Sequence, residues 1–340
     1  MEELPDLQGS GRDFAYYEDL EVSNYIREDE IEKIISGIFS DYEGGKNIDK
    51  IDLFNQPDKA EVQELVQNLF RIIYPGYFRD RSYKIYNPKN SFAVISEDVF
   101  YHLNKEVFLA LDYCTRRGTL TDDDRRRESY RICKEFFKSI PRIREYIETD
   151  LLAAYDGDPA AGCLEEIILS YPGLVAVTVY RIAHELYKLM VPVLPRLMTE
   201  YAHSQTGIDI HPGATIDKYF FIDHGTGIVI GETAVIGKNV KIYQGVTLGA
   251  LSTRGGQKLS GKKRHPTICD NVTIYANASV LGGDTVIGEN AVIGGSAFIT
   301  KSVAPNTRVS MKNLEMEYKT DNDEIRIVEL GQSDEWYYII

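Results

Sequence analysis

The chain has 340 residues, a formal net charge of −14 at pH 7 and a hydrophobic content of 43%. This length favours about two domains, and the acidic balance disfavours broad binding to nucleic acid. The first ten residues lack the apolar stretch of a secretory signal, no apolar run reaches the ~18 residues of a membrane span, and the four cysteines form no CxxC pair. We therefore expect a cytoplasmic protein that binds no nucleic acid, no membrane and no metal.

Residues 1–205 are predicted to form a helical domain. Asp58 follows a proline and precedes apolar residues that recur on one helical face, so it should begin a helix. Ser96 is expected to cap a second helix, and Thr121, which is followed by three aspartates, a third. The sequence Pro172-Gly173 should interrupt a later helix, and a last helix is expected over about 193–203.

Aliphatic residues recur at every sixth position from Ile210 to about Val303, with three interruptions. Neither a helical period nor strand alternation produces this spacing. Three such hexads make one triangular coil, and stacked coils make a parallel β-helix. A β-sandwich with glycine-rich turns would not keep fourteen aliphatic residues in phase. These residues are Ile210, Ile216, Ile222, Ile228, Ile230, Ile236, Ile242, Leu248, Ile268, Ile274, Val280, Ile287, Ile293 and Ile299.

The predicted fold class is thus α+β, with a helical domain at 1–205, a β-helix at 206–311 and an acidic tail at 312–340. A loop at 249–267 interrupts the repeat and is rich in glycine, lysine and arginine. Such a loop on a rigid scaffold suits closure over an anionic ligand. It could equally be a surface loop with solvated charges.

Two polar residues, Asp209 and His224, stand out within the repeat. They lie fifteen residues apart, which is less than one coil of three hexads. An imidazole supported by a carboxylate is the usual general base, because the carboxylate fixes the tautomer and stabilises the imidazolium. Alternatively, His224 occupies a corner and Asp209 caps the first coil. The spacing alone does not decide between these interpretations.

Several motifs resemble serine O-acetyltransferase of the hexapeptide-repeat acyltransferase superfamily. They are GIDIHPGATI, DHGTGIVIGETAVIG, the loop ending in RHPTI, and upstream Asp158-Pro159 and Tyr180-Arg-Ile-Ala-His184. The resemblance covers about residues 155–305. It implies that the β-helix is left-handed. It also implies transfer of acetyl from acetyl-CoA to the hydroxyl of L-serine, which gives O-acetyl-L-serine and CoA, the first step of cysteine biosynthesis.

The resemblance assigns roles to individual residues. It implies that His224 is the general base and that Asp209 assists it. Residues 155–205 contribute to the acceptor site, and the acceptor-binding residues are Asp158, Pro159, Asp223, Glu232, Arg264 and His265. CoA is expected along the groove between adjacent β-helices, at Gly249, Ala250, Lys262, Tyr275, Ala276 and Gly295. The chain departs from the family after residue 306, where Thr307-Arg-Val-Ser-Met-Lys-Asn replaces the usual G-V-P-A-R ending.

The resemblance also implies partners. A homotrimer would form through the β-helix, and a dimer of trimers through the helical domain. The C-terminal Ile340 would enter the active site of O-acetylserine sulfhydrylase, where backbone donors capture its carboxylate. Alternatively, the aromatic residues Trp336, Tyr337 and Tyr338 pack the tail against the body.

Three other functions compete with this hypothesis. A related acyltransferase could acetylate a sugar or another small hydroxyl acceptor. A γ-type carbonic anhydrase would need three zinc-binding histidines, for which His211, His224 and His265 are the candidates, but the expected close pair is missing. A non-catalytic scaffold would leave the work to the helices, and changing His224 would then have no effect.

Overall fold

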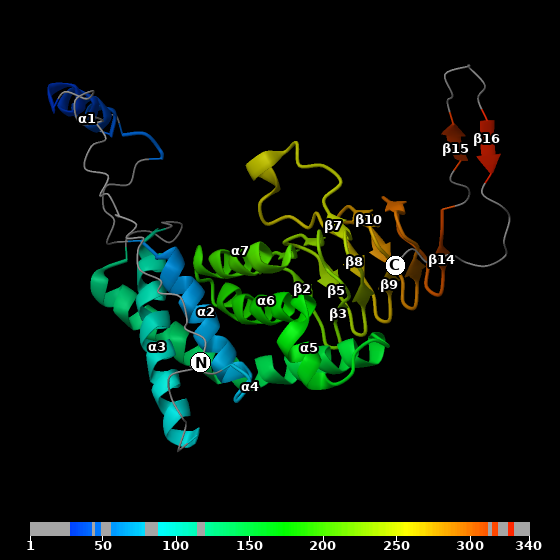
Figure 1. Cartoon of the computed structure of the whole chain (residues 1–340), viewed down its shortest axis with the longest axis horizontal. Coiled ribbons are helices and arrows are strands. Elements are labelled where there is room, and N and C mark those ends of the chain that lie inside the picture. Colours follow the sequence, from blue (N-terminus) through cyan, green and yellow to red (C-terminus); the bar gives the residue numbers. More distant parts are fainter. Residues whose placement is uncertain are drawn as a thin grey trace, which may run out of the picture. The chain divides into compact units, whose positions relative to one another are not determined.

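The computed structural model describes residues 28–42, 45–48, 56–78, 88–113, 120–311, 315–318 and 326–329 (Figure 1). By its contacts the chain divides into two units, Met1–Phe54 and Asn55–Ile340. In the first unit, α1 (Glu28–Tyr42) carries exposed apolar residues at helical spacing. The predicted aromatic cluster at 336–338 and Ile340 lie outside the described residues.

The second unit begins with six helices, α2 (Lys59–Ile73), α3 (Pro88–Tyr113), α4 (Asp122–Gly157), α5 (Leu164–Ser170), α6 (Pro172–Lys188) and α7 (Leu194–Thr206). Asp58 caps α2 and Thr121 caps α4 through side-chain hydrogen bonds, as predicted. The prediction for Ser96 was wrong, because this residue lies inside α3. That helix starts at Pro88, whose fixed φ angle suits a first helical position.

The break at Pro172 separates α5 from α6, as predicted, and the two helices are bent by 74°. Among the described residues no single helix is long and apolar enough to cross a membrane, although this bent pair reaches the required length and composition together. The last helix, α7, ends at Gly207, which adopts a left-handed φ of 72°.

Fourteen short strands then form three parallel sheets around one axis (Figure 1). Sheet A has the order β1-β4-β7-β10-β13, sheet B β2-β5-β8-β11 and sheet C β3-β6-β9-β12-β14. The strands are β1 (Asp209–Ile210), β2 (Thr215–Ile216), β3 (Phe221–Ile222), β4 (Val229–Ile230), β5 (Val235–Ile236), β6 (Lys241–Ile242), β7 (Thr247–Gly249), β8 (Thr267–Ile268), β9 (Thr273–Ile274), β10 (Ser279–Leu281), β11 (Val286–Ile287), β12 (Val292–Ile293), β13 (Phe298–Ile299) and β14 (Arg308–Val309). Beyond them, β15 (Glu315–Tyr318) and β16 (Arg326–Glu329) pair antiparallel.

The hexad prediction of a parallel β-helix is confirmed. Ile210 pairs with Ile230 in sheet A, and Ile216 with Ile236 in sheet B, so equivalent residues of successive coils stack. Every predicted inward aliphatic residue is buried except Ile299, which is partly buried in the last coil. Full burial of such a side chain stabilises the fold by about 1.5–3 kcal/mol, and stacking shares this gain between coils.

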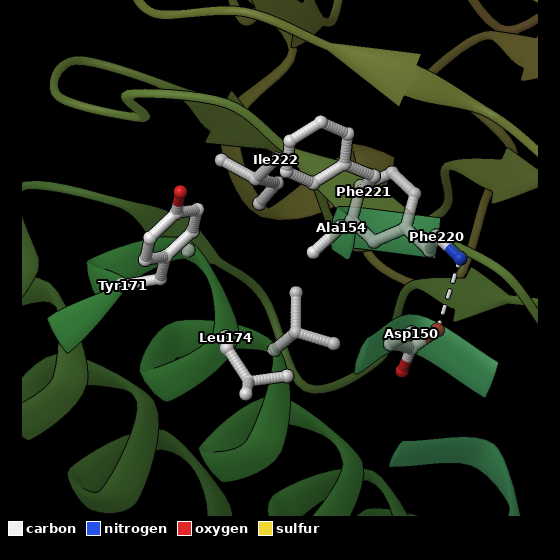
Figure 2. A pocket seen from close by; sticks show the side chains of 9 residues that line it. Asp150, Ala154, Tyr171, Leu174, Phe220, Phe221 and Ile222 are labelled. Atoms are coloured by element: carbon white, nitrogen blue, oxygen red, sulfur yellow. Dashed lines mark hydrogen bonds between the residues drawn. The ribbon is translucent and has the colours of Figure 1, made fainter. Parts of the chain in front are cut away.

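A buried ion pair joins the helices to the first coil of the β-helix. Arg181 of α6 donates from Nε and Nη2 to the two carboxylate oxygens of Asp150 in α4, at 2.6 and 2.8 Å. The same guanidinium donates to the backbone carbonyls of Ile216 and Asp217, at 2.9 and 2.8 Å. The Asp150 carboxylate also accepts the backbone N–H of Phe220, as Figure 2 shows. Both charged groups are therefore fully paired where α4, α6 and the first coil meet.

The apolar residues around this ion pair fill the same seam. Ala154 of α4, Leu174 of α6 and Phe221 of β3 line a cavity of only about 10 Å³ there (Figure 2), space for about one water molecule. The helices and the β-helix thus share one compact unit. The functional boundary predicted at residue 205 remains a prediction.

Replacing Arg181 by Met should destabilise the chain by about 3–5 kcal/mol, because it leaves the Asp150 carboxylate buried and unpaired. Urea unfolding would measure this loss. The matched control is Arg131→Met in α4, since Arg131 pairs with Glu128 at the surface and exposed pairs contribute at most about 1 kcal/mol. Equal losses in the two variants would contradict the structural role of the buried pair.

Candidate active site

The predicted site residues gather at two corners of the triangular coil. We call the turns that lead from sheet C to sheet A the C–A corner (223–228, 243–246, 275–278 and 294–297). The turns from sheet A to sheet B form the A–B corner (211–214, 231–234, 250–266 and 282–285). Asp223, His224, Tyr275, Ala276 and Gly295 lie at the C–A corner, and Glu232, Ala250, Lys262, Arg264 and His265 at the A–B corner. Sheet A separates the two corners.

His224 projects into solvent from the C–A corner. Its side chain is 59% exposed, and its Nδ1 lies 3.8 Å from an oxygen of Asp223, beyond hydrogen-bonding distance. Its φ of 57° is a left-handed value that a residue with a Cβ adopts at a cost of about 1–3 kcal/mol. The His224 ring lies 6.5 Å from that of Tyr243, which stacks on Tyr275. The imidazole is therefore exposed above an aromatic wall.

The end of α4 brings Asp158 to the same corner. Tyr171 donates a hydrogen bond of 2.6 Å to its carboxylate and thereby lowers the pKa of Asp158. Lys241 donates to the carbonyl of Gly157 and lies 3.8 Å from Asp223. Burial lowers the pKa of Lys241, while the two carboxylates act against this effect. The exposed Pro159 follows directly in the turn. The C–A corner thus combines two carboxylates with an imidazole and with the ammonium group of Lys241.

The A–B corner presents a cationic group. Arg264 pairs through Nη2 with Glu232, which also accepts from the hydroxyl of Tyr187 at 3.1 Å. Burial alone would raise the pKa of Glu232, but the hydrogen bond and charge of Arg264 lower it overall. The other terminal nitrogen of Arg264, Nη1, is buried without a hydrogen-bond partner among the described residues. A buried donor left unpaired costs about 1–3 kcal/mol, so a turn of the guanidinium that brings Nη1 to an anionic group would remove this cost.

The buried imidazole of His265 has a defined tautomer. The backbone N–H of Thr233 donates to its Nδ1 at 3.0 Å, so this nitrogen carries no proton. Burial, reinforced by the charge of Arg264, lowers the pKa of His265 to about 4. At neutral pH the ring is therefore uncharged and bears its proton on Nε2. It can donate a hydrogen bond there but is poorly suited to act as a base.

Asp209, the predicted assistant of the general base, lies on sheet A and contacts a helix instead. Its carboxylate lies 3.3 Å from Arg196 of α7, which also pairs with Glu200. Ligand atoms of Glu200, His203 and Asp209 lie within 4.8 Å of one another, a spacing that a metal ion could bridge. The guanidinium of Arg196 already neutralises both carboxylates, which disfavours a cation. Among the described residues, no hydrogen bond or ion pair links Asp209 to His224.

The predicted CoA-binding residues are divided in the same way. Gly249 ends β7 and Ala250 begins the A–B loop, whereas Tyr275, Ala276 and Gly295 line the C–A corner. Lys262 is exposed in the loop, where η2 (Gly256–Leu259) is the regular element.

The three histidines proposed for a carbonic anhydrase do not converge. His211 and His265 share the A–B corner, but His224 lies at the C–A corner, across sheet A. The Nδ1 atom of His211 accepts the backbone N–H of Gly213 at 3.0 Å. This arrangement does not resemble a three-histidine zinc site.

Several residues around the site were missed by sequence reasoning, namely Tyr171, Tyr187, Arg196, Thr233, Lys241 and Tyr243. Thr233 lies within the motif DHGTGIVIGETAVIG, but its spacing gives it no chemical role, and the others belong to no motif with such a role. Their partners lie far away in sequence: Tyr187 is 45 residues from Glu232, and Thr233 is 32 from His265. A periodic contact map of the coils would have been needed to find them.

No protein-family model matches this chain. It is 40% identical to the plasmid-encoded serine acetyltransferase of Synechococcus elongatus over 223 residues, which is 64% of this chain and 70% of that protein. The structure resembles Entamoeba histolytica serine acetyltransferase 1 in complex with L-cysteine, with a TM-score of 0.64 and 38% identity over 75% of this chain and 87% of that one. Isoform 3 from the same organism, in complex with cysteine, gives a TM-score of 0.65 and 34% identity over 86% and 96% of the two chains.

These similarities identify the chain as an acyltransferase built on a left-handed parallel β-helix. The hexads predicted the parallel β-helix, and the motifs implied its handedness and the enzyme class. The chain belongs to the serine acetyltransferase family. Further curated relatives match over a shorter stretch, such as the Bacillus subtilis serine acetyltransferase, which is 50% identical over 126 residues, or 55% of its length.

Replacing Tyr171 by Phe should raise KM for serine about tenfold, because the Asp158 carboxylate loses a strong hydrogen bond. The pKa of Asp158 should rise only towards its ordinary value of about 3.9, so the carboxylate stays ionised in both proteins between pH 7 and 9. Steady-state kinetics in that range would measure the change in KM. The control is Tyr130→Phe, at an exposed tyrosine of α4, and equal KM values for the two variants would argue against a role for Tyr171.

Proposed function

We propose that this protein transfers acetyl from acetyl-CoA to the hydroxyl of L-serine and that the two corners hold opposite ends of the amino acid. Serine carries an ammonium and a carboxylate. Asp158 and Asp223 supply negative charge at the C–A corner, and the unpaired Nη1 of Arg264 supplies a donor at the A–B corner. This division of charge is the observation that carries the proposal. Arginine suits the carboxylate because its planar fork can bind both oxygens.

His224 is the proposed general base. Its exposed imidazole would take the proton of the serine hydroxyl as the oxygen attacks the thioester carbonyl. The C–S bond then breaks, and CoA leaves as a thiolate that takes up a proton. No covalent enzyme intermediate is required, since positioning two bound substrates supplies much of the acceleration. Asp209 would assist His224 once the imidazole of His224 lies next to the Asp209 carboxylate.

We further propose that the complete site forms between protomers of a homotrimer. In one chain, sheet A lies between the corners, and Asp209 and His224 are not in contact. A closed rotational assembly would place the C–A corner of one β-helix against the A–B corner of the next, because each interface joins two different surfaces. The predicted CoA residues would then line the groove between two β-helices. Pairing of two trimers through the helices and binding of the sulfhydrylase by Ile340 remain proposals from the family resemblance.

The solved relatives support an amino-acid acceptor rather than a sugar. Two of them contain cysteine, which differs from serine only in bearing sulfur in place of the hydroxyl oxygen. A pocket for that molecule needs one anionic and one cationic wall, and the two corners provide both. A sugar acceptor carries neither charge and would give the Nη1 atom of Arg264 no anionic partner.

Thiol release from acetyl-CoA would test the proposed function directly. We expect release with L-serine and not with L-homoserine, galactosides or buffer alone. His224→Ala should lower kcat at least about 100-fold, because general base catalysis contributes about 10²–10⁴-fold. Release with a sugar but not with serine would overturn the acceptor, and full activity of the His224 variant would overturn the assignment of the base.

A further inference from the structure

Thr233 connects to the end of the inserted loop through nearly all of its polar atoms. Its hydroxyl oxygen accepts the backbone N–H groups of Arg264 and His265, at 2.9 and 3.1 Å, and lies 2.9 Å from His265 Nδ1. Its own N–H donates to the same Nδ1 at 3.0 Å. One threonine therefore fixes both the backbone and the imidazole of the two residues proposed to bind the acceptor.

The ammonium of Lys263 completes the connection. It donates to the backbone carbonyls of Thr233, His265 and Pro266, at 2.7, 2.5 and 3.1 Å. Burial lowers the pKa of Lys263, but three carbonyl acceptors match the three protons of an ammonium group. Although the residue lies at the surface, its charged end faces the protein backbone. It is therefore not available to bind a phosphate of CoA.

Neighbouring coils leave no spare room at this point. A Cβ atom at Gly231 would lie 2.1 Å from Cδ2 of His265, and one at Gly283 would lie 2.5 Å from the carbonyl oxygen of Lys263. The glycines thus allow residues 263–265 to lie directly between two coils. The hydrogen bonds of Thr233 and Lys263 then determine how residues 263–265 are oriented in this space.

We propose that Thr233 and Lys263 form a clamp that positions Arg264 and His265 for the amino-acid acceptor. The clamp fixes the end of the loop independently of its exposed portion. It also holds the imidazole with Nδ1 as acceptor, which leaves the proton on Nε2, so that His265 acts as a neutral donor beside Arg264. Thr233 and Lys263 are positioning residues, since they act through their neighbours. This inference rests on the proposed function, because it concerns the same acceptor site.

The groups that face His265 explain why a neutral imidazole matters. Arg264, Lys263 and His211 repel a proton on the ring, whereas Glu232 attracts one. If the clamp is lost, the ring can turn towards solvent and titrate near the ordinary histidine value of about 6.5. A protonated His265 would then compete with Arg264 for Glu232.

The test compares Thr233→Val, Thr233→Ser and Lys263→Met in the full-length protein, with Lys258→Met as the matched control in the exposed loop. We expect Thr233→Val and Lys263→Met to raise KM for serine about tenfold and KM for acetyl-CoA less than about twofold. Thr233→Ser keeps the hydroxyl and should restore serine binding. The pH dependence of kcat/KM between about pH 5 and 7 should be steeper in Thr233→Val than in the wild type, because His265 would then titrate in addition to the proposed base His224.

Three results would overturn the clamp: an unchanged KM for serine in both Thr233→Val and Lys263→Met, an equal rise in both KM values, or an unaltered pH profile. If Thr233→Val does not fold, Lys263→Met against Lys258→Met decides. Failure of the proposed function looks different, because the wild type itself would then not acetylate serine. An active wild type that loses activity in His224→Ala, together with a neutral Thr233→Val, contradicts only the clamp.

Discussion

The buried pair of Asp150 and Arg181 is the interaction on which the position of the site depends. Its two charges bind α4 and α6 to the carbonyls and N–H groups of the first coil. Because α4 ends at Gly157, directly before Asp158, the same contact sets where this carboxylate meets the C–A corner. Paired buried charges add little net stability, but they tolerate few alternative arrangements. The helices therefore contribute to the site by fixing one of its carboxylates.

The triangular coil imposes the second constraint. Each hexad turns the chain through one side of the triangle, so groups at different corners face different directions. The carboxylates and His224 are consequently directed away from Arg264 and His265 within one chain. In the proposed trimer, a ligand that contacts both sets lies between two copies. That assembly would be part of the chemistry, since each protomer alone would present only half of the charge pattern that a zwitterionic acceptor requires.

The hexad period made the β-helix predictable, because it requires inward residues at fixed intervals that no other fold reproduces. Caps at Asp58 and Thr121 followed from local hydrogen bonding, whereas the Ser96 prediction failed because serine is also tolerated inside helices, and proline gives the stronger start signal. The candidate site residues came from motifs rather than from periodicity. The contacts of Thr233 escaped prediction because the inserted loop lies between β5 and β8. These strands pair, with Val235 opposite Thr267, although their separation in sequence is not the three hexads of one regular coil.

Subunit mixing would test the central claim, that the site joins the C–A corner of one protomer to the A–B corner of the next. His224→Ala and Arg264→Ala should each be inactive alone. Coexpressed in equal amounts, they should recover about one quarter of wild-type activity, since half of the protomers supply each intact corner independently. Coexpression of His224→Ala with Asp223→Asn, which damage the same corner, should recover none. Failure of the first pair to recover activity would contradict a shared site.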